Sequence, residues 1–250
     1  MQNLKMVIRY DGTRYSGWQK QGNTENTIQG KLESAISRIA GQAVEVHGSG
    51  RTDAGVHAMG QVANVKLKTA VDPAEFRRKL NDLLSEDIAV TEICEVPERF
   101  HARLSAVRKT YQYRLYIGDA KPVFDRRQVT VLEPLPSLNI EAMRRAAEYL
   151  RGIHDFTSFC GNPSFKKSAV RRIDSLEIIE EADELVIRVT GDGFLQNMVR
   201  IITGTLIEVG KGAMRPEEIR DILAAKNRKN AGPTAPAKGL MLVGVEYTPS

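Results

Sequence analysis

The sequence predicts an α+β fold in two halves, each with the element order β-α-β-β-α-β. Three observations predict it: apolar residues recur at strand and helix spacings in this order twice, turn residues separate the periodic segments, and no low-complexity linker divides the halves. Halves of this order are ferredoxin-like. We therefore expect two ferredoxin-like halves, residues 1–106 and 107–250, packed together with adjoining antiparallel sheets and a central cleft.

The first half supplies six periodic segments. The segment that stops at Gly41 has its apolar residues at helical spacing. A second helix opens with Asp72 as N-cap and Pro73 at its first position. The expected elements are, in order, a strand at Leu4–Tyr10, a helix at Thr27–Ala40, strands at Val44–His47 and Gln61–Lys68, a helix at Pro73–Leu84 and a strand at Ile88–Glu95.

The second half repeats the order and adds one helix. Asn139 is the expected cap of its first helix, and a long apolar helix is expected to end at Gly210. The expected elements are a strand at Thr110–Ile117, a helix at Ile140–Leu150, strands at Arg172–Ile179 and Leu185–Thr190, helices at Phe194–Val209 and Pro216–Ala225, and a strand at Leu240–Tyr247.

Cysteine and histidine usage bounds the chemistry. Two cysteines, Cys94 and Cys160, occur without CxxC spacing, which argues against a disulfide framework and indicates a cytoplasmic protein. The four histidines lack the spacing of metal ligands, so no metal is expected. No apolar run approaches the ~20 residues that cross a bilayer, so no membrane partner is expected either.

The net charge of +5 is modest, and its distribution is more informative. A long loop is expected at Gly152–Ala169, with Phe156, Phe159, Phe165 and the basic pair at 166–167, and a second basic pair at 171–172 follows it. Aromatic side chains interleaved with basic residues suit stacking on the unpaired nucleotides of an RNA. The other interpretation, which we favour for Phe156 and Phe159, is that the phenylalanines dock on the core.

The segment Gly48–His57 reads Gly-Ser-Gly-Arg-Thr-Asp-Ala-Gly-Val-His and holds one acid, Asp53, and one base, Arg51. Glycines let the backbone turn sharply or approach a ligand closely. An acid beside a flexible, basic turn is a candidate reactive carboxylate. The alternative is a polar hairpin loop that caps itself with Asp53.

Two tyrosines stand on the first predicted strand of the second half. Tyr111 and Tyr113 share one face of that strand. Such a face offers a stacking surface and a phenolic hydroxyl. The alternative is a half-buried tyrosine pair, a common fate of aromatic strand residues.

Arg200 lies in the long apolar helix, where we expect it to be substantially buried. A buried guanidinium needs a charged partner. Asp53 is the favoured partner, and the local acids Glu208 and Asp192 are the alternatives. An aspartate beside an arginine stays ionised, which suits a nucleophile or a base rather than a general acid.

Five motifs occur in order along the chain, at Tyr10–Gln19, Gly50–Ala58, Phe100–Arg103, Asn197–Arg200 and Ala231–Leu240. Together they resemble the tRNA pseudouridine synthase A (TruA) family. The similarity runs in register from near residue 4 to near residue 247.

The resemblance implies a cofactor-independent isomerase that converts uridine to pseudouridine at positions 38, 39 and 40 of the tRNA anticodon stem-loop, working as a homodimer. It implies that Asp53 is the essential catalytic residue, that Tyr111 contacts the target base and that Arg200 is the active-site arginine. It also implies that Arg51 fills the space left by the flipped nucleotide and that Leu240 packs against the flipped base.

Several alternatives stay open or are excluded. Asp53 could act as a nucleophile or as the base that removes a ribose proton. A non-catalytic RNA-binding module is the main rival function, although it would have little use for a buried Arg200 with a carboxylate partner. An aspartyl hydrolase would need a second Asp-Gly motif, for which Asp192-Gly193 lacks the preceding strand and the Thr or Ser between its residues. A phosphate-binding loop is excluded because Gly48–Gly55 has no Lys-Ser/Thr ending.

Overall fold

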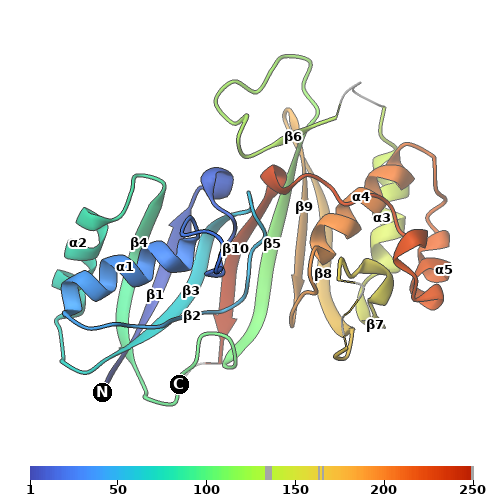
Figure 1. The fold of residues 1–250 in the computed structure, drawn as a ribbon. Helices are drawn as coiled ribbons and strands as arrows, with labels where there is room; N and C mark the ends of the chain where they lie inside the picture. The colour runs from blue at the N-terminus through green and yellow to red at the C-terminus, as the bar shows by residue number, and fades with distance from the viewer. Residues whose placement is uncertain (133–136, 163, 165, 249–250) are drawn as a thin grey trace. The chain divides into compact units, whose positions relative to one another are not determined.

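The computed structural model describes residues 1–132, 137–162, 164 and 166–248. The chain divides into two compact units, one of Met1–Val107 with Met241–Ser250 and one of Arg108–Leu240. Strands and helices both contribute to each unit, so the expected α+β class is confirmed (Figure 1). Within the described ranges, no helix has the length and apolar character that crossing a membrane requires.

The first unit is built on a sheet whose strands lie in the order β4 (Ile88–Val96), β1 (Gln2–Tyr10), β3 (His57–Leu67) and β10 (Leu240–Tyr247), with β2 (Val46–Gly48) paired to β3. β1 is antiparallel to both of its neighbours. β10 is parallel to β3, with Met241 opposite His57. Helices α1 (Ile28–Ala40) and α2 (Pro73–Leu83) pack beside each other against these strands (Figure 1).

The helix boundaries of the first unit follow local capping chemistry. The side chain of Thr27 accepts a hydrogen bond from the Gly30 N–H, and that of Asp72 accepts one from the Glu75 N–H. Gly41 ends α1 in the left-handed conformation, at φ 63°. The expected order β-α-β-β-α-β of the first half is confirmed.

β3 begins at His57, earlier than the expected Gln61, and Gly60 lies inside it. A Cβ atom at Gly60 would come within 2.5 Å of the Val243 carbonyl oxygen on β10. A glycine within a strand is favoured where another backbone approaches closely, so Gly60 does not end the strand here.

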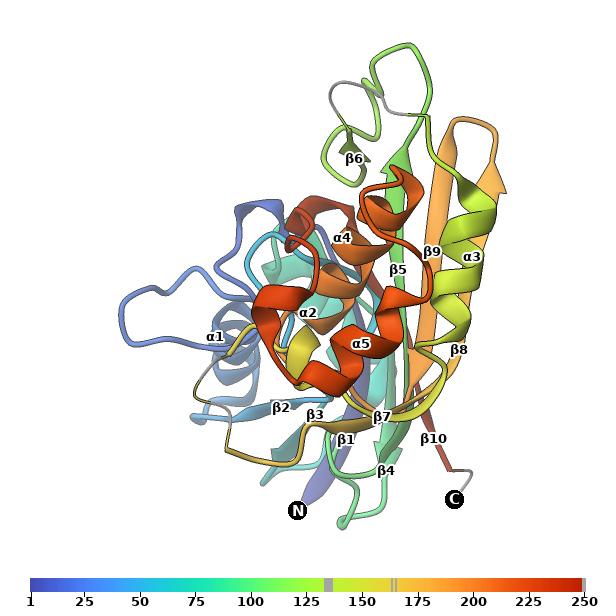
Figure 2. The ribbon, with the colours of Figure 1, turned by 90° about the vertical axis from the view of Figure 1, so that its right-hand side faces the viewer.

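The second unit has an antiparallel sheet in the order β5 (Ala106–Tyr116), β9 (Glu184–Gly191), β8 (Val170–Glu181) and β7 (Gly152–Asp155), and β6 (Thr130–Val131) runs parallel to β5. Its helices are α3 (Ile140–Glu148), α4 (Met198–Gly210) and α5 (Glu218–Ala225). α3 contacts both β8 and α4, and Figure 2 shows these helices in front of the strands. Asn139 caps α3 as expected, accepting from the Ala142 N–H.

Two helix starts predicted for the second half are wrong. The long helix begins at Met198 rather than Phe194, because Asn197 has φ 60° and lies outside the helical conformation. The apolar spacing that continues through Leu195 gave no sign of this turn. The extra helix begins at Glu218 rather than Pro216.

The expected loop at Gly152–Ala169 is also partly wrong. Its first four residues form β7, whose residue Ile153 lies opposite Arg172 of β8. Phe156 and Phe159 are completely buried, as favoured from the sequence. Phe165 lies outside the described residues.

The last strand has the expected bounds, Leu240–Tyr247. It pairs with β3, and Met241–Ser250 groups with the first unit. That each half is a complete ferredoxin-like unit stays a prediction. Adjoining sheets and a central cleft stay predictions.

Candidate active site

Asp53 lies in the connection between β2 and β3, on a tight turn. The Val56 N–H donates to the Asp53 carbonyl oxygen at 3.1 Å, and Gly55 has φ 77°. A positive φ favours glycine, so the glycine at this point is required by the turn. Thr52 is buried, Asp53 is half-buried and Arg51 is exposed. The Arg51 Nε donates to the Gln19 Oε1 at 3.1 Å.

The segment that follows β1 holds this turn in place. The hydroxyls of Tyr10 and Thr52 share a hydrogen bond of 2.8 Å. The Trp18 N–H donates to the Thr52 carbonyl at 3.1 Å, and the Gly55 N–H donates to the Tyr15 carbonyl at 3.3 Å. Three hydrogen bonds thus fix the backbone on both sides of Asp53.

Close backbone approach explains a second glycine. The helical turn η1 (Gly12–Arg14) sits against the Asp53 turn, and a Cβ atom at Gly12 would lie 2.0 Å from the Val56 carbonyl oxygen. The Gly12 N–H donates to Nδ1 of His57 at 3.1 Å. Only glycine allows this approach without displacing the turn.

A buried polar pair supports the start of the same connection. Ser49 and Gln61 are both fully buried. The Ser49 Oγ donates to the Gln61 Oε1 at 2.7 Å, and the Gln61 Nε2 donates to the Gly50 carbonyl at 3.1 Å. Buried polar groups that satisfy each other fix a unique local geometry. Sequence reasoning assigned no role to Tyr10 or Gln61, although a polar residue within a predicted strand was an available signal.

Tyr111 and Tyr113, the two tyrosines on the predicted face of β5, are buried, at 7% exposure for Tyr111 and 0% for Tyr113. The Tyr111 ring meets Phe194 edge-on, with centroids 5.3 Å apart. The Tyr113 hydroxyl lies 2.7 Å from the Thr130 Oγ1 and donates to the Pro236 carbonyl at 3.0 Å. Burial raises the pKa of Tyr113 to about 12, so its hydroxyl stays protonated at neutral pH.

Arg200 lies on α4 and is mostly buried, in line with the expectation from its apolar neighbours. Its Nε donates to the Ala235 carbonyl at 2.7 Å, and its Nη1 donates to the Asn197 Oδ1 at 3.0 Å. The local acids considered as partners make other contacts. Glu208 pairs with Lys211 at 3.1 Å, and Asp192 accepts from the Arg172 N–H at 3.0 Å.

The tail motif Ala231–Leu240 packs on the part of α4 that carries Arg200 and Gly204. A Cβ atom at Gly204 would lie 1.8 Å from the Pro233 carbonyl oxygen, so the two backbones are in contact. Leu240, at the end of this motif, is 5% exposed. The motifs Asn197–Arg200 and Ala231–Leu240, far apart in the sequence, therefore form one packed group in the second unit.

The structure thus groups the predicted site residues into two sets. Arg51 and Asp53 belong to the first unit. Tyr111, Arg200 and Leu240 belong to the second. The expected pairing of Asp53 with Arg200 stays a prediction.

A family model described as tRNA pseudouridine synthase matches residues 6–104 and 146–248. The chain belongs to this family. Named tRNA pseudouridine synthases also align over nearly the whole chain. One from Bacillus sp. (strain KSM-64), tRNA pseudouridine synthase A, is 48% identical over 247 residues, covering 99% of this chain and 100% of the relative.

Two further relatives show the same extent. The tRNA pseudouridine synthase A 2 of Bacillus cereus (strain ZK / E33L) is 46% identical, covering 99% of this chain and 100% of the relative. The tRNA pseudouridine synthase A of Citrifermentans bemidjiense (strain ATCC BAA-1014 / DSM 16622 / JCM 12645 / Bem) is 46% identical, covering 99% and 98%. The resemblance to the TruA family is confirmed, and the chain is an isomerase of uridine in tRNA.

The segments matched by the tRNA pseudouridine synthase model include Arg51, Asp53, Arg200 and Leu240. Tyr111 lies between the two matched segments, outside both. Its assignment therefore depends on the motif resemblance and on its place on β5.

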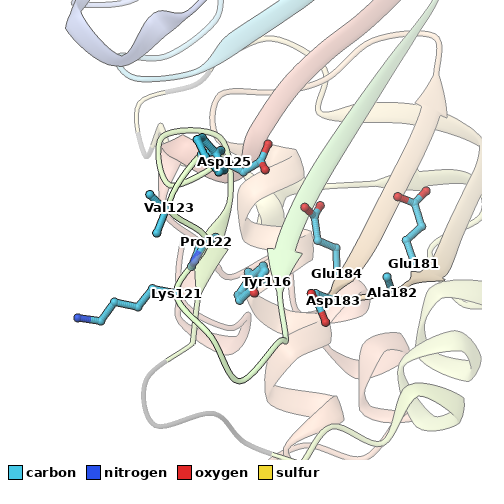
Figure 3. A pocket seen from close by; sticks show the side chains of 10 residues that line it. Tyr116, Lys121, Pro122, Val123, Asp125, Glu181, Ala182, Asp183 and Glu184 are labelled. Atoms are coloured by element: carbon cyan, nitrogen blue, oxygen red, sulfur yellow. The ribbon is translucent and has the colours of Figure 1, made fainter.

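A pocket of about 470 Å³ in the second unit contains none of these residues. Figure 3 shows its acidic side chains: Glu181, Asp183 and Glu184 come from the β8–β9 turn, and Asp125 comes from the facing loop. Lys121 also lines the pocket. Two of the carboxylates, Asp125 and Glu184, pair with Arg114 at 3.3 Å and 2.5 Å. Among the residues that the structure describes, no group of three or more His, Cys, Asp or Glu is arranged to hold a metal ion.

Proposed function

We propose that this tRNA pseudouridine synthase acts at positions 38, 39 and 40 of the anticodon stem-loop, with Asp53 as its essential catalytic residue. The observation that supports Asp53 most directly is its setting: a half-buried carboxylate on a turn held by hydrogen bonds with the Tyr10 hydroxyl, the Trp18 N–H and the backbone carbonyl of Tyr15. A fixed carboxylate is what catalysis at one sugar carbon requires.

The reaction needs no redox partner because its atoms balance within the nucleotide. The bond from ribose C1′ to uracil N1 breaks, the base turns, and a bond from C1′ to C5 forms. The proton on C5 is lost, and N1 gains one. Asp53 serves either as the nucleophile at the sugar or as the base that removes a ribose proton, and both roles need it ionised.

The remaining site residues have roles that follow from their chemistry. Tyr111 is proposed to stack on the target uracil, with Phe194 supporting its ring edge-on. Arg200 is proposed to keep the Asp53 carboxylate charged and in place. Arg51 is exposed and is proposed to fill the space that the flipped nucleotide leaves, and Leu240 to contact the flipped base.

Two wider features of the proposal concern assembly and RNA contact. We propose that the chain works as a homodimer, which light scattering of the purified protein tests directly. Lys166 and Lys167 are exposed and are proposed to contact tRNA phosphates. Their replacement by alanine should lower the steepness with which salt weakens tRNA binding.

The deciding experiment uses tRNA tritiated at C5 of uridine. Wild-type protein should release tritium and Asp53→Asn should not. Asp72→Asn is the matched control, because Asp72 is an N-cap and asparagine caps equally well. Separate transcripts with a single uridine at position 38, 39 or 40 identify the sites. Equal release by Asp53→Asn and wild type would exclude Asp53 as the catalytic residue.

A further inference from the structure

Tyr10 is the last residue of β1, and its side chain contacts Thr52 in the Asp53 turn. It is 5% exposed, and its hydroxyl lies 2.8 Å from the Oγ1 of Thr52, which is itself 6% exposed. Burial raises the pKa of Tyr10 to about 12. The hydroxyl therefore stays protonated at neutral pH.

Thr52 is held at two points and immediately precedes Asp53. Its side chain bonds to Tyr10, and its carbonyl accepts from the Trp18 N–H at 3.1 Å. After Asp53, the next fixed point is Gly55, which donates to the Tyr15 carbonyl. The bond from Tyr10 thus anchors the residue next to Asp53 through its side chain.

We propose that Tyr10 is a positioning residue for the isomerisation, acting through Thr52 to set the direction in which the Asp53 carboxylate points. This inference rests on the proposed function, because it matters for turnover only if Asp53 does the chemistry. Removing the Tyr10 hydroxyl leaves the Thr52 hydroxyl buried without that partner, and the turn then shifts to satisfy it. Small displacements of a catalytic group cost turnover far more than they cost binding.

Tyr15 provides a matched control on the same segment. It is 6% exposed, and its hydroxyl lies 3.0 Å from the Ser85 Oγ and donates to the Asp87 Oδ1 at 2.6 Å. Tyr15→Phe thus removes a partly buried hydroxyl whose two partners, Ser85 and Asp87, are not part of the Asp53 turn. Its backbone carbonyl, which Gly55 uses, is unchanged by the substitution.

The test measures kcat and KM of tritium release, with thermal unfolding of each variant recorded so that all assays run on folded protein. Tyr10→Phe should lower kcat by about tenfold or more while KM changes by less than about twofold. Tyr15→Phe should keep kcat within about twofold of wild type, even if its unfolding temperature falls by as much as that of Tyr10→Phe. Equal losses of kcat in the two variants, or a loss carried by KM, would overturn the proposal.

Thr52 variants keep the test decisive if Tyr10→Phe does not fold. Thr52→Val removes the partner hydroxyl and should reproduce the fall in kcat, whereas Thr52→Ser keeps it and should restore kcat. The double variant Tyr10→Phe, Thr52→Val should be no slower than Tyr10→Phe alone, because the buried Gln61 side chain, which also bonds to the Tyr10 hydroxyl, loses that partner in both variants and the unpaired Thr52 hydroxyl is gone. Asp53→Asn distinguishes a failure of the proposed function from a failure of the positioning role. An active Asp53→Asn variant would refute the proposed catalytic role of Asp53. An inactive Asp53→Asn together with a fully active Tyr10→Phe would refute only the positioning role of Tyr10.

Discussion

The Nε of Arg200 donates a hydrogen bond of 2.7 Å to the carbonyl oxygen of Ala235, and the Ala235 N–H returns one of 3.1 Å to the Arg200 carbonyl. The arginine of α4 and the tail that ends at Leu240 are therefore positioned together. A change at one is transmitted to the other through two hydrogen bonds and the close contact at Gly204.

Arg200→Lys should lower kcat of tritium release by about tenfold or more. Lysine keeps the charge but lacks the planar fork that bonds Ala235 and Asn197 at the same time. Arg38→Lys, at an exposed position in the last turn of α1, is the control and should leave kcat unchanged. Full activity of Arg200→Lys would show that charge alone is needed at this position.

Gly12→Ala should lower the free energy of unfolding by about 1–3 kcal/mol and reduce turnover. The new methyl group would come within 2.0 Å of the Val56 carbonyl, so the turn that carries Asp53 must move. Gly22→Ala is the control, since no atom lies within 4 Å of a Cβ built there. Urea unfolding and tritium release of both variants check this, and equal stability of the two would contradict the close approach.

The helix starts of the first unit could be predicted because their signals are local. Thr27 and Asp72 lie within three residues of the N–H groups that they accept from, so a short stretch of sequence contains the whole interaction. The start of α4 could not be predicted, because the left-handed backbone at Asn197 interrupts an apolar pattern that reads as helical. The partner of β10 could not be predicted either, since alternation in a strand shows its faces and not its neighbour.

The candidate site divides in the same way. Asp53 could be identified because glycines, a base and an acid occur within ten residues. The groups that support it could not, because Tyr10 and Thr52 are 42 residues apart in the sequence and meet only in the folded sheet. The burial of most of Arg200 could be predicted from its apolar neighbours, whereas its bond to Ala235, 35 residues along the chain, could not.

Stability should fall between pH 10 and about 12, and Tyr113 should contribute to the fall. Burial raises the pKa of Tyr113 from 10.0 to about 12 in the folded protein. Below pH 10 both states keep the proton, and the stabilising contribution is complete. Above pH 10 the unfolded state loses its proton first, so the free energy of unfolding decreases until the folded group also ionises.

Tyr113→Phe isolates this contribution. The variant loses the hydrogen bonds to Thr130 and Pro236 at every pH, but its free energy of unfolding should depend less steeply on pH between 10 and 12 than that of wild type. Urea unfolding at intervals from pH 8 to pH 12 measures both slopes. Parallel slopes would mean that Tyr113 ionises alike in the folded and unfolded states.

Tyr111→Phe should keep tRNA affinity and lower turnover. Phenylalanine preserves the buried ring and its edge-on contact with Phe194, so a stacking role survives the substitution. Only a role of the hydroxyl is lost, such as assisting removal of the C5 proton, and that loss appears in kcat rather than in binding. Tyr116→Phe is the matched control, because Tyr116 is equally buried but lies on the opposite face of β5. If Tyr111→Phe and Tyr116→Phe both turn over at the wild-type rate, Tyr111 is a stacking surface and the proton on C5 leaves with the help of another group.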